Sequence, residues 1–342
     1  MPQRTILLTG ASGVVGSALL TRLSRHRVIC LTHRVIPAGA AEVVRGDLRR
    51  PGLGLDAHIR RKLAREVDVV IHCAAATDFS TGTQATWELN VEGTYHLLQF
   101  AVDAAAVLHY LSTAFVSRTE SSRTDAGEAT ADPHAYLASK RAAEQLVRDS
   151  GMPGTILRPS VVIGDAATGA IARFQGLHML ALALVRNSVP LLPVRPEARV
   201  DAVSQDVLAG AVAALIDHDV RGGEYWITAG RAALTAHRVV DLIVEVGNRV
   251  GLDVRAPRLV DPEMVDRLVR PAFIEFLPPA ARRRFDDMLA MTALVADADA
   301  FPATLAEIPD CLPIESGQLV SAFDRSIGYL IRDIGLARES AA

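Results

Sequence analysis

Lysine is almost absent from this sequence. Lys62 and Lys140 are the only two among 36 basic residues in a chain of 342, so arginine supplies nearly every positive charge. The net charge of −3 gives no reason to expect nucleic acid as a partner. A lysine kept in such a composition marks a position that needs an ammonium group with an adjustable pKa.

Cysteine is scarce as well. Cys30, Cys73 and Cys311 are widely spaced and odd in number, and two of them lie in runs typical of buried strands. We therefore expect reduced core thiols. No metal site is expected, because His72 and Cys73 share a strand end without partners at ligand spacing.

Long hydrophobic runs are missing too. The most apolar late stretch, Met179–Val185, is far too short to span a bilayer. Arg4 leads directly into the strand-like run Thr5–Thr9, which does not resemble a signal peptide. We expect a protein without a transmembrane segment, located in the cytoplasm. The sequence does not decide between a monomer and a homodimer.

What the sequence does contain is an alternation of short β-branched runs with helical patterns. Half of the residues are hydrophobic, which is ample for a large core. The pattern predicts βαβ units and a doubly wound parallel sheet of the Rossmann type, an α/β fold. The expected strands are 6–8, 27–31, 67–72, 107–111 and 154–158, and the expected helices are 14–25, 84–106 and 135–149.

A glycine-rich turn joins the first strand to the first helix. Its glycines Gly10, Gly13 and Gly16 follow the spacing Gly-x-x-Gly-x-x-Gly. Such a turn lets the backbone approach a pyrophosphate, whose charge the helix N-terminus stabilises. The residues expected to bind the dinucleotide here are Thr9, Gly10, Ser12, Gly13, Val14, Val15 and Gly16.

The ends of the second and third strands bear on the choice of dinucleotide. Leu31-Thr32-His33-Arg34 has no acid that could bind a ribose 2′-hydroxyl. Arg34 suits a 2′-phosphate, which favours NADPH over NADH, although an exposed surface arginine is a close alternative. Asp47 and Leu48 follow the probable third strand, where Asp47 is expected to accept from the adenine amino group or else to form a turn.

Tyr136 and Lys140 are four residues apart in Tyr136-Leu137-Ala138-Ser139-Lys140. Five tyrosines and two lysines in this length give roughly a 3% chance of that spacing at random. On a helix the two side chains share one face. The alternative is a surface lysine beside a half-buried tyrosine.

The second half of the chain is less regular. Residues 165–198 have an apolar helical pattern, Gly222–Gly230 predicts one more strand at the sheet edge, and the chain from Pro257 onward is mostly helical with many prolines. We expect residues 1–164, rejoined by 199–230, to form the NADP-binding Rossmann domain. Residues 165–198 and 231–342 would then form a smaller, mostly helical substrate-binding part.

Together these motifs resemble the extended short-chain dehydrogenase/reductase family, and most closely its thioester-reductase and fatty acyl-CoA reductase branch, the male sterility type. The resemblance is specific over residues 5–164 and thinner beyond. It rests on His72-Cys73-Ala74-Ala75-Ala76-Thr77-Asp78-Phe79, Asn90-Val91-Glu92-Gly93-Thr94, Leu111-Ser112-Thr113-Ala114-Phe115-Val116, Tyr136-Leu137-Ala138-Ser139-Lys140 and Leu157-Arg158-Pro159-Ser160-Val161-Val162-Ile163-Gly164.

The resemblance implies roles for individual residues. Tyr136 is the catalytic acid, Lys140 lowers its pKa and holds the nicotinamide ribose, and Thr113 takes the catalytic Ser/Thr position. Asn90 matches an asparagine that supports a proton relay through water, or is instead a helix-bending residue. Residues implied to line the cofactor are Ala74, Ala75, Pro159, Val161 and Val162.

Elementary chemistry agrees with these roles. Hydride delivery to a carbonyl builds negative charge on oxygen, which needs a donor in place. Bringing a tyrosine from a pKa of ~10 towards neutrality takes about 4 kcal/mol, which an ammonium and the oxidised nicotinamide can supply. The expected substrate is an acyl thioester on CoA or an acyl carrier protein, or another small carbonyl.

Three functions remain open from the sequence. The first is an NADPH-dependent reductase of an acyl thioester. The second is a nucleotide-sugar epimerase or dehydratase, or a hydroxysteroid or flavonol-type dehydrogenase on the same fold. The third is a non-catalytic NAD(P)-binding sensor, which would have no need of Tyr136, Lys140 and Thr113.

Overall fold

A computed structural model describes most of the chain, and the fold below refers to that part. The described residues are 2–79, 81–118, 133–265, 267, 278–279, 282, 286–287, 289, 292, 294 and 299–336. The predicted helical character of residues 266–298 therefore falls largely outside them.

Seven parallel strands form the central sheet of the described chain, in the order β11-β6-β5-β4-β1-β2-β3. This confirms the predicted doubly wound sheet, with the predicted strand at 222–230 on its edge. The strands are β1 (Thr5–Thr9), β2 (Arg27–Thr32), β3 (Glu42–Arg45), β4 (Val69–His72), β5 (Val107–Leu111), β6 (Gly154–Pro159) and β11 (Glu224–Ile227).

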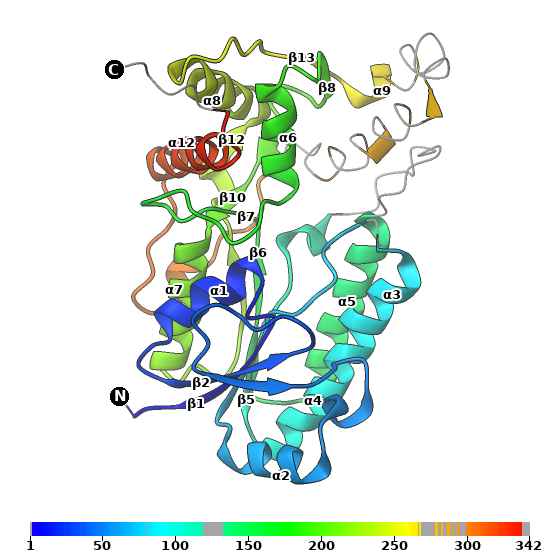
Figure 1. Ribbon diagram of the computed structural model, residues 1–342, viewed down its shortest axis with the longest axis vertical. Coiled ribbons are helices and arrows are strands. Elements are labelled where there is room, and N and C mark those ends of the chain that lie inside the picture. Colours follow the sequence, from blue (N-terminus) through cyan, green and yellow to red (C-terminus); the bar gives the residue numbers. More distant parts are fainter. Residues whose placement is uncertain are drawn as a thin grey trace.

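Helices cover both faces of this sheet (Figure 1). Because successive strand residues point to opposite faces, Leu8 packs with Leu19 and Val212 on one side, and Leu7 packs with Phe100 on the other. The first face carries α1 (Val14–Arg22) and α7 (Gln205–Asp217). The second carries α2 (Ala57–Glu66), α4 (Gly93–Ala104) and α5 (Pro133–Asp149).

The strand order reverses between β1 and β4, the two strands at the centre of the sheet. The chain segments that leave the carboxyl ends of β1 and β4 diverge to opposite faces of the sheet, and ligands of such sheets bind at this point. Most predicted cofactor and catalytic residues lie on loops or helices that follow strands of this sheet. Thr9 and Pro159 end β1 and β6, and Val161 and Val162 lie in the short strand that follows β6.

The predicted helix over 84–106 is interrupted. It comprises α3 (Thr83–Trp87), a π-helical turn over Glu88–Glu92, and α4. The π-turn contains Asn90, whose side chain bonds to a neighbouring loop, and such turns often occur at functional sites.

The second half differs from its prediction in two places. Residues 165–198 are helical only in α6 (Gly176–Val185), because Asp165 Oδ1 accepts from the amides of Ala167 and Thr168 and so folds the start into a turn. Beyond Pro257 the described residues include a strand, β13 (Arg258–Val260), and long irregular stretches before α12 (Ser316–Asp333). The remaining elements are η1 (Pro51–Gly54), η3 (Ala114–Ser117), η4 (Gly230–Ala232), η7 (Leu305–Glu307), α9 (Pro262–Met264), β7 (Val161–Ile163), β8 (Leu191–Pro193), β9 (Arg199–Val200), β10 (Ala202–Ser204), β12 (Leu234–Thr235) and α8 (Ala236–Arg249).

Helices α6, α8 and α12 gather above the sheet (Figure 1) and enclose a hydrophobic cluster of their own, which includes Leu184, Ile243 and Phe323. The separate clusters support the predicted division into a Rossmann domain and a smaller substrate-binding part, which stays a prediction. Cys30, Cys73 and Cys311 are free thiols, as predicted. In the described residues no helix has the length and apolar character needed to cross a bilayer.

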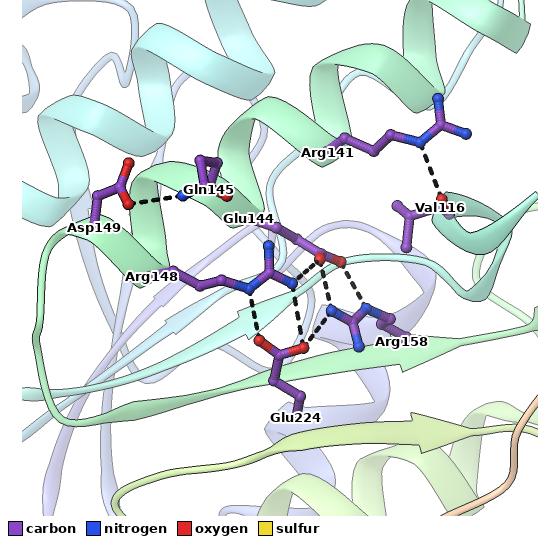
Figure 2. Close-up of polar contacts among 8 residues, drawn as sticks. All are labelled: Val116, Arg141, Glu144, Gln145, Arg148, Asp149, Arg158 and Glu224. Carbon is purple, nitrogen blue, oxygen red and sulfur yellow. Dashed lines mark hydrogen bonds and ion pairs between the residues drawn. The ribbon is translucent and has the colours of Figure 1, made fainter. Parts of the chain in front are cut away.

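A buried ion pair fastens α5 to the sheet (Figure 2). Arg158 of β6 donates to both carboxylate oxygens of Glu144 on α5, at 2.9 and 2.7 Å, and both side chains are nearly inaccessible. Arg148 and Glu224 complete the network, and hydrogen bonds from Arg148 hold the pKa of Glu224 down to about 2. The helix that carries Tyr136 and Lys140 is therefore fixed in position.

Glu144→Ala is expected to lower the free energy of unfolding by about 3 kcal/mol, because it leaves the buried Arg158 guanidinium with less compensation. The matched control is Glu245→Ala, which breaks the exposed Arg238–Glu245 pair and should cost under about 1 kcal/mol. Urea denaturation of both variants measures the difference. Equal losses would contradict the structural role assigned to Glu144.

Candidate active site

The glycine-rich turn lies against the loop that follows β4. Gly10 has a φ of +72°, and a Cβ there would lie 2.6 Å from the amide nitrogen of Ala74. A Cβ on Gly16 would lie 2.2 Å from the Gly10 carbonyl oxygen. Only glycine permits these approaches, so the turn can sit at the switch point of the sheet.

Helix α1 starts directly after this turn. Its N-cap is Gly13, no side chain caps its first amides, and no acidic residue occupies its first turn. Unsatisfied amides at a helix N-terminus bind anions, because they combine free donors with the positive end of the helix dipole. The residues present therefore fit the diphosphate of a dinucleotide, as the sequence predicts for Thr9 to Gly16.

The predicted adenosine contacts lie at the carboxyl ends of β2 and β3. Arg34 is exposed after β2. Asp47 follows β3, but Arg49 donates to both of its carboxylate oxygens and lowers the pKa of Asp47. The side chain of Leu48 packs into the core beneath. Contacts of these three residues with a cofactor stay predictions.

Thr113 and Tyr136 come together at the ends of β5 and α5. Thr113 caps the short helix η3, where its Oγ1 accepts from Phe115 N at 3.4 Å, and it is hydrogen-bonded to the Tyr136 hydroxyl. Arg141 of α5 donates to the Val116 carbonyl at 3.0 Å (Figure 2), which holds η3 against α5. The structure thus brings the predicted acid beside the predicted hydroxyl.

Burial raises the pKa of Tyr136 well above its usual range, and the hydrogen bond with Thr113 offsets only part of that effect. The lowering of the Tyr136 pKa by Lys140, which the family resemblance implies, stays a prediction. A raised pKa keeps the phenol protonated, which is the form that can donate a proton.

Lys140 lies one turn further along α5 and is only 4% exposed. Its Nζ donates to the Leu111 carbonyl oxygen at 2.7 Å and to the Tyr110 hydroxyl at 3.4 Å. Burial lowers the pKa of Lys140 to about 8, while the Cys73 and Glu144 side chains act in the opposite direction. This placement excludes the alternative of a surface lysine.

Asn90 uses its whole side-chain amide within the protein. Oδ1 accepts from Ala76 N at 2.7 Å, and Nδ2 donates to the Ala76 carbonyl at 3.1 Å and to Ser139 Oγ at 2.9 Å. The residue therefore joins the loop after β4 to α5, between Tyr136 and Lys140. A water relay at Asn90 stays a prediction.

The remaining predicted residues lie in or after β4, β6 and β7. Ala74 and Ala75 follow β4, and Ala74 N donates to Thr9 Oγ1 at 3.2 Å. Pro159 ends β6, Val161 packs in one cluster with Tyr136, and Val162 belongs to the core.

The family model described as male sterility protein, an NAD-binding family, matches residues 37–212, which is more than half of the chain. The chain belongs to the male sterility protein family. This confirms the predicted extended short-chain dehydrogenase/reductase and makes the protein an oxidoreductase with a nicotinamide dinucleotide as cofactor.

Its relatives include parts of much larger proteins. The hybrid PKS-NRPS synthetase pvhA of Talaromyces variabilis is 35% identical over 174 residues, which are 47% of this chain and 4% of that protein. The chain thus spans a small fraction of the length of this curated relative.

Two solved structures show the same fold. The terminal R domain from the myxalamid PKS-NRPS pathway has a TM-score of 0.71 at 24% identity, covering 99% of this chain and 93% of that one. The reductase (R) domain of a nonribosomal peptide synthetase from Mycobacterium tuberculosis has a TM-score of 0.66 at 22% identity, covering 96% and 93%.

Sequence reasoning gave no role to several residues beside this male sterility-type site, although Phe79 and Ser112 stand in the motifs that carry the resemblance. Phe79 packs its ring 5.3 Å from that of Tyr136, and Ser112 Oγ is buried with no hydrogen-bond partner among the described residues. Tyr110 lies under Lys140. A tyrosine within the predicted buried strand Val107–Leu111 was the available signal, since a buried phenol needs a hydrogen-bond partner.

Proposed function

We propose that this male sterility-type protein uses NADPH to reduce an acyl thioester, held on an acyl carrier protein or CoA, to the aldehyde. The observation that carries the proposal is the likeness to a segment of hybrid PKS-NRPS synthetases, together with the fold of reductase domains from such systems. The thioester substrate is the one that the resemblance to the thioester-reductase branch implies.

The proposed reaction balances with one cofactor. NADPH supplies the hydride, which forms a C–H bond at the thioester carbonyl carbon while a proton joins the oxygen. The resulting hemithioacetal loses its C–S bond and gives an aldehyde and a free thiol. The sum is thioester, NADPH and one proton to aldehyde, thiol and NADP⁺.

The proposed roles follow from the positions of the side chains. Tyr136, kept protonated by burial, donates the proton to the carbonyl oxygen, and Thr113 beside it supplies a second hydrogen bond. Lys140 holds the nicotinamide ribose and, with the positive charge of the oxidised nicotinamide, favours the tyrosinate that remains. Asn90 holds helix α5 and the loop that follows β4 in their relative positions.

The preference for NADPH is proposed from Arg34. It is exposed at the end of β2, in a segment without a carboxylate that would repel a 2′-phosphate or bind a 2′-hydroxyl. The guanidinium can contact the phosphate through two parallel hydrogen bonds.

The reaction is tested by following nicotinamide absorbance with purified protein, NADPH and a panel of acyl-CoAs, acyl carrier protein thioesters, ketones and sugar nucleotides. Thioesters are expected to oxidise NADPH and to release one thiol per hydride, measured with a thiol reagent. Turnover of a ketone or sugar nucleotide without any thioester turnover would exclude the proposal in favour of the epimerase or dehydrogenase reading.

Tyr136→Phe is expected to lower kcat at least about 10²-fold, because it removes the general acid. Cofactor affinity, measured by fluorescence titration, should stay within about twofold. Tyr95→Phe is the matched control, since Tyr95 is exposed on α4 and its hydroxyl accepts only a surface hydrogen bond from Gln99. Unchanged turnover in Tyr136→Phe would remove this residue from the mechanism.

Arg34→Ala is expected to raise KM for NADPH about tenfold or more and to leave KM for NADH unchanged, because a charge-assisted contact with the 2′-phosphate is lost. Arg61→Ala, on an exposed face of α2 below the sheet, serves as the control. Steady-state kinetics with NADPH and with NADH give the ratio of the two KM values in each variant. A parallel change for NADPH and NADH would argue against phosphate recognition by Arg34.

A further inference from the structure

A chain of buried hydrogen bonds leads from Lys140 through the interior of the protein. Lys140 Nζ donates to the Tyr110 hydroxyl and lies 4.9 Å from the centre of the Tyr110 ring. The Tyr110 hydroxyl is hydrogen-bonded in turn to Thr94 of α4. Tyr110 and Thr94 are each only 1% exposed, so water does not compete for these bonds.

The chain continues across the sheet to the glycine-rich turn. Thr94 Oγ1 lies 3.1 Å from Nε2 of His72, the last residue of β4, and His72 Nδ1 lies 2.7 Å from Thr9 Oγ1, the last side chain of β1. Thr9 Oγ1 also accepts from the amide of Ala74. His72 and Thr9 are completely buried. The network therefore joins α5, β5, α4, β4 and β1.

The protons of this network can be assigned from its ends. Thr94 Oγ1 lies 2.6 Å from the Asn90 carbonyl oxygen, which can only accept, so the single Thr94 hydroxyl proton is used there. His72 Nε2 must then donate to Thr94, and Nδ1 accepts from Thr9. Desolvation, together with the charge of Lys140, lowers the pKa of His72 to about 3, so the ring stays neutral in this tautomer.

The same reasoning orients Tyr110. Because the Thr94 proton is committed to Asn90, the Tyr110 hydroxyl donates to Thr94 and turns its lone pairs towards Lys140. The ammonium thus gives two of its three donors to Tyr110 Oη and to the Leu111 carbonyl. Its third donor remains for the site that Tyr136 borders.

We propose that Tyr110 is a positioning residue for Lys140, and that Thr94 and His72 hold the Tyr110 hydroxyl with its lone pairs facing the ammonium. The inference rests on the role given to Lys140 in the proposed function. The chain is not a proton path, because His72 does not take up a proton near neutral pH and burial keeps Tyr110 protonated.

The scarcity of lysine makes a direct test practical. The protein contains only Lys62 and Lys140, so lysine labelled with ¹³C at Cε gives two NMR signals, and Lys62→Arg assigns them. The titration of Lys140 can then be followed in the whole protein without substrate or cofactor.

The other groups around Lys140 leave this titration clear. Burial holds the pKa of Cys73 at about 12 and that of Tyr136 above its usual range. Burial lowers the pKa of His72 and raises the pKa of Tyr110, so neither group titrates near neutral pH. Glu144 is held in ion pairs with Arg148 and Arg158. A transition of the Lys140 signal near pH 8 therefore belongs to its own ammonium.

Tyr110→Phe keeps the ring and removes the hydroxyl that accepts from Lys140. The midpoint of the Lys140 titration is therefore expected to fall by about one pH unit. Thr94→Val, which releases the Tyr110 hydroxyl, should lower it by about half as much. The matched control is Thr155→Val, which breaks the similar buried His109–Thr155 bond of 2.8 Å on the neighbouring strands. It should leave the midpoint unchanged.

Activity gives the second readout. At pH 8, a midpoint lower by about one pH unit reduces the protonated fraction of Lys140, and hence kcat, about fivefold in Tyr110→Phe. The pH at which kcat falls should move with the NMR midpoint. Thr155→Val should show neither change.

The two proposals fail separately. A Lys140 midpoint that is the same in wild type, Tyr110→Phe and Thr94→Val would overturn the positioning role, whatever the activity. If Tyr110→Phe does not fold, Thr94→Val against Thr155→Val decides alone. A shifted midpoint in a protein that reduces no thioester would uphold the positioning role and refute the proposed function.

Discussion

Burial of the Lys140 ammonium is the constraint on which the site depends. A charge that is only 4% exposed loses most of its hydration, and the protein replaces it with the Leu111 carbonyl, the Tyr110 hydroxyl and ring, and the nearby Glu144 carboxylate. These groups come from β5 and α5. Because groups on both elements must surround the buried ammonium, α5 and β5 are held in one relative position.

Two further contacts maintain that position at two places along α5. The Glu144–Arg158 ion pair ties the middle of the helix to β6, and Asn90 ties its first turns, through Ser139, to the loop after β4. That loop lies in turn against Gly10, where no side chain fits. The glycine-rich turn, helix α5 and the strand ends thus form one connected unit at the switch point of the sheet.

Much of this arrangement could be predicted because it rests on local patterns. Apolar strand runs, the Gly10–Gly16 turn and the Tyr136–Lys140 spacing each fix the backbone or one helix face within a few residues. Parallel strands then bring their carboxyl ends to one edge, so the predicted residues had to meet there. Prediction was wrong for residues 165–198, where an Asp165 turn overrides an apolar pattern that favours a helix.

The sequence by itself determined the fold class, the family and the lysine that is expected to serve the site. Only the tertiary structure decided what that ammonium contacts. Lys140 and Tyr110 are 30 residues apart, and Thr9 and His72 are 63 apart, so their bonds depend on the register of β1, β4 and β5. The spacing of residues along the chain does not show which residues of two paired strands lie side by side. Hydrogen bonds between such distant residues form only after the strands have paired.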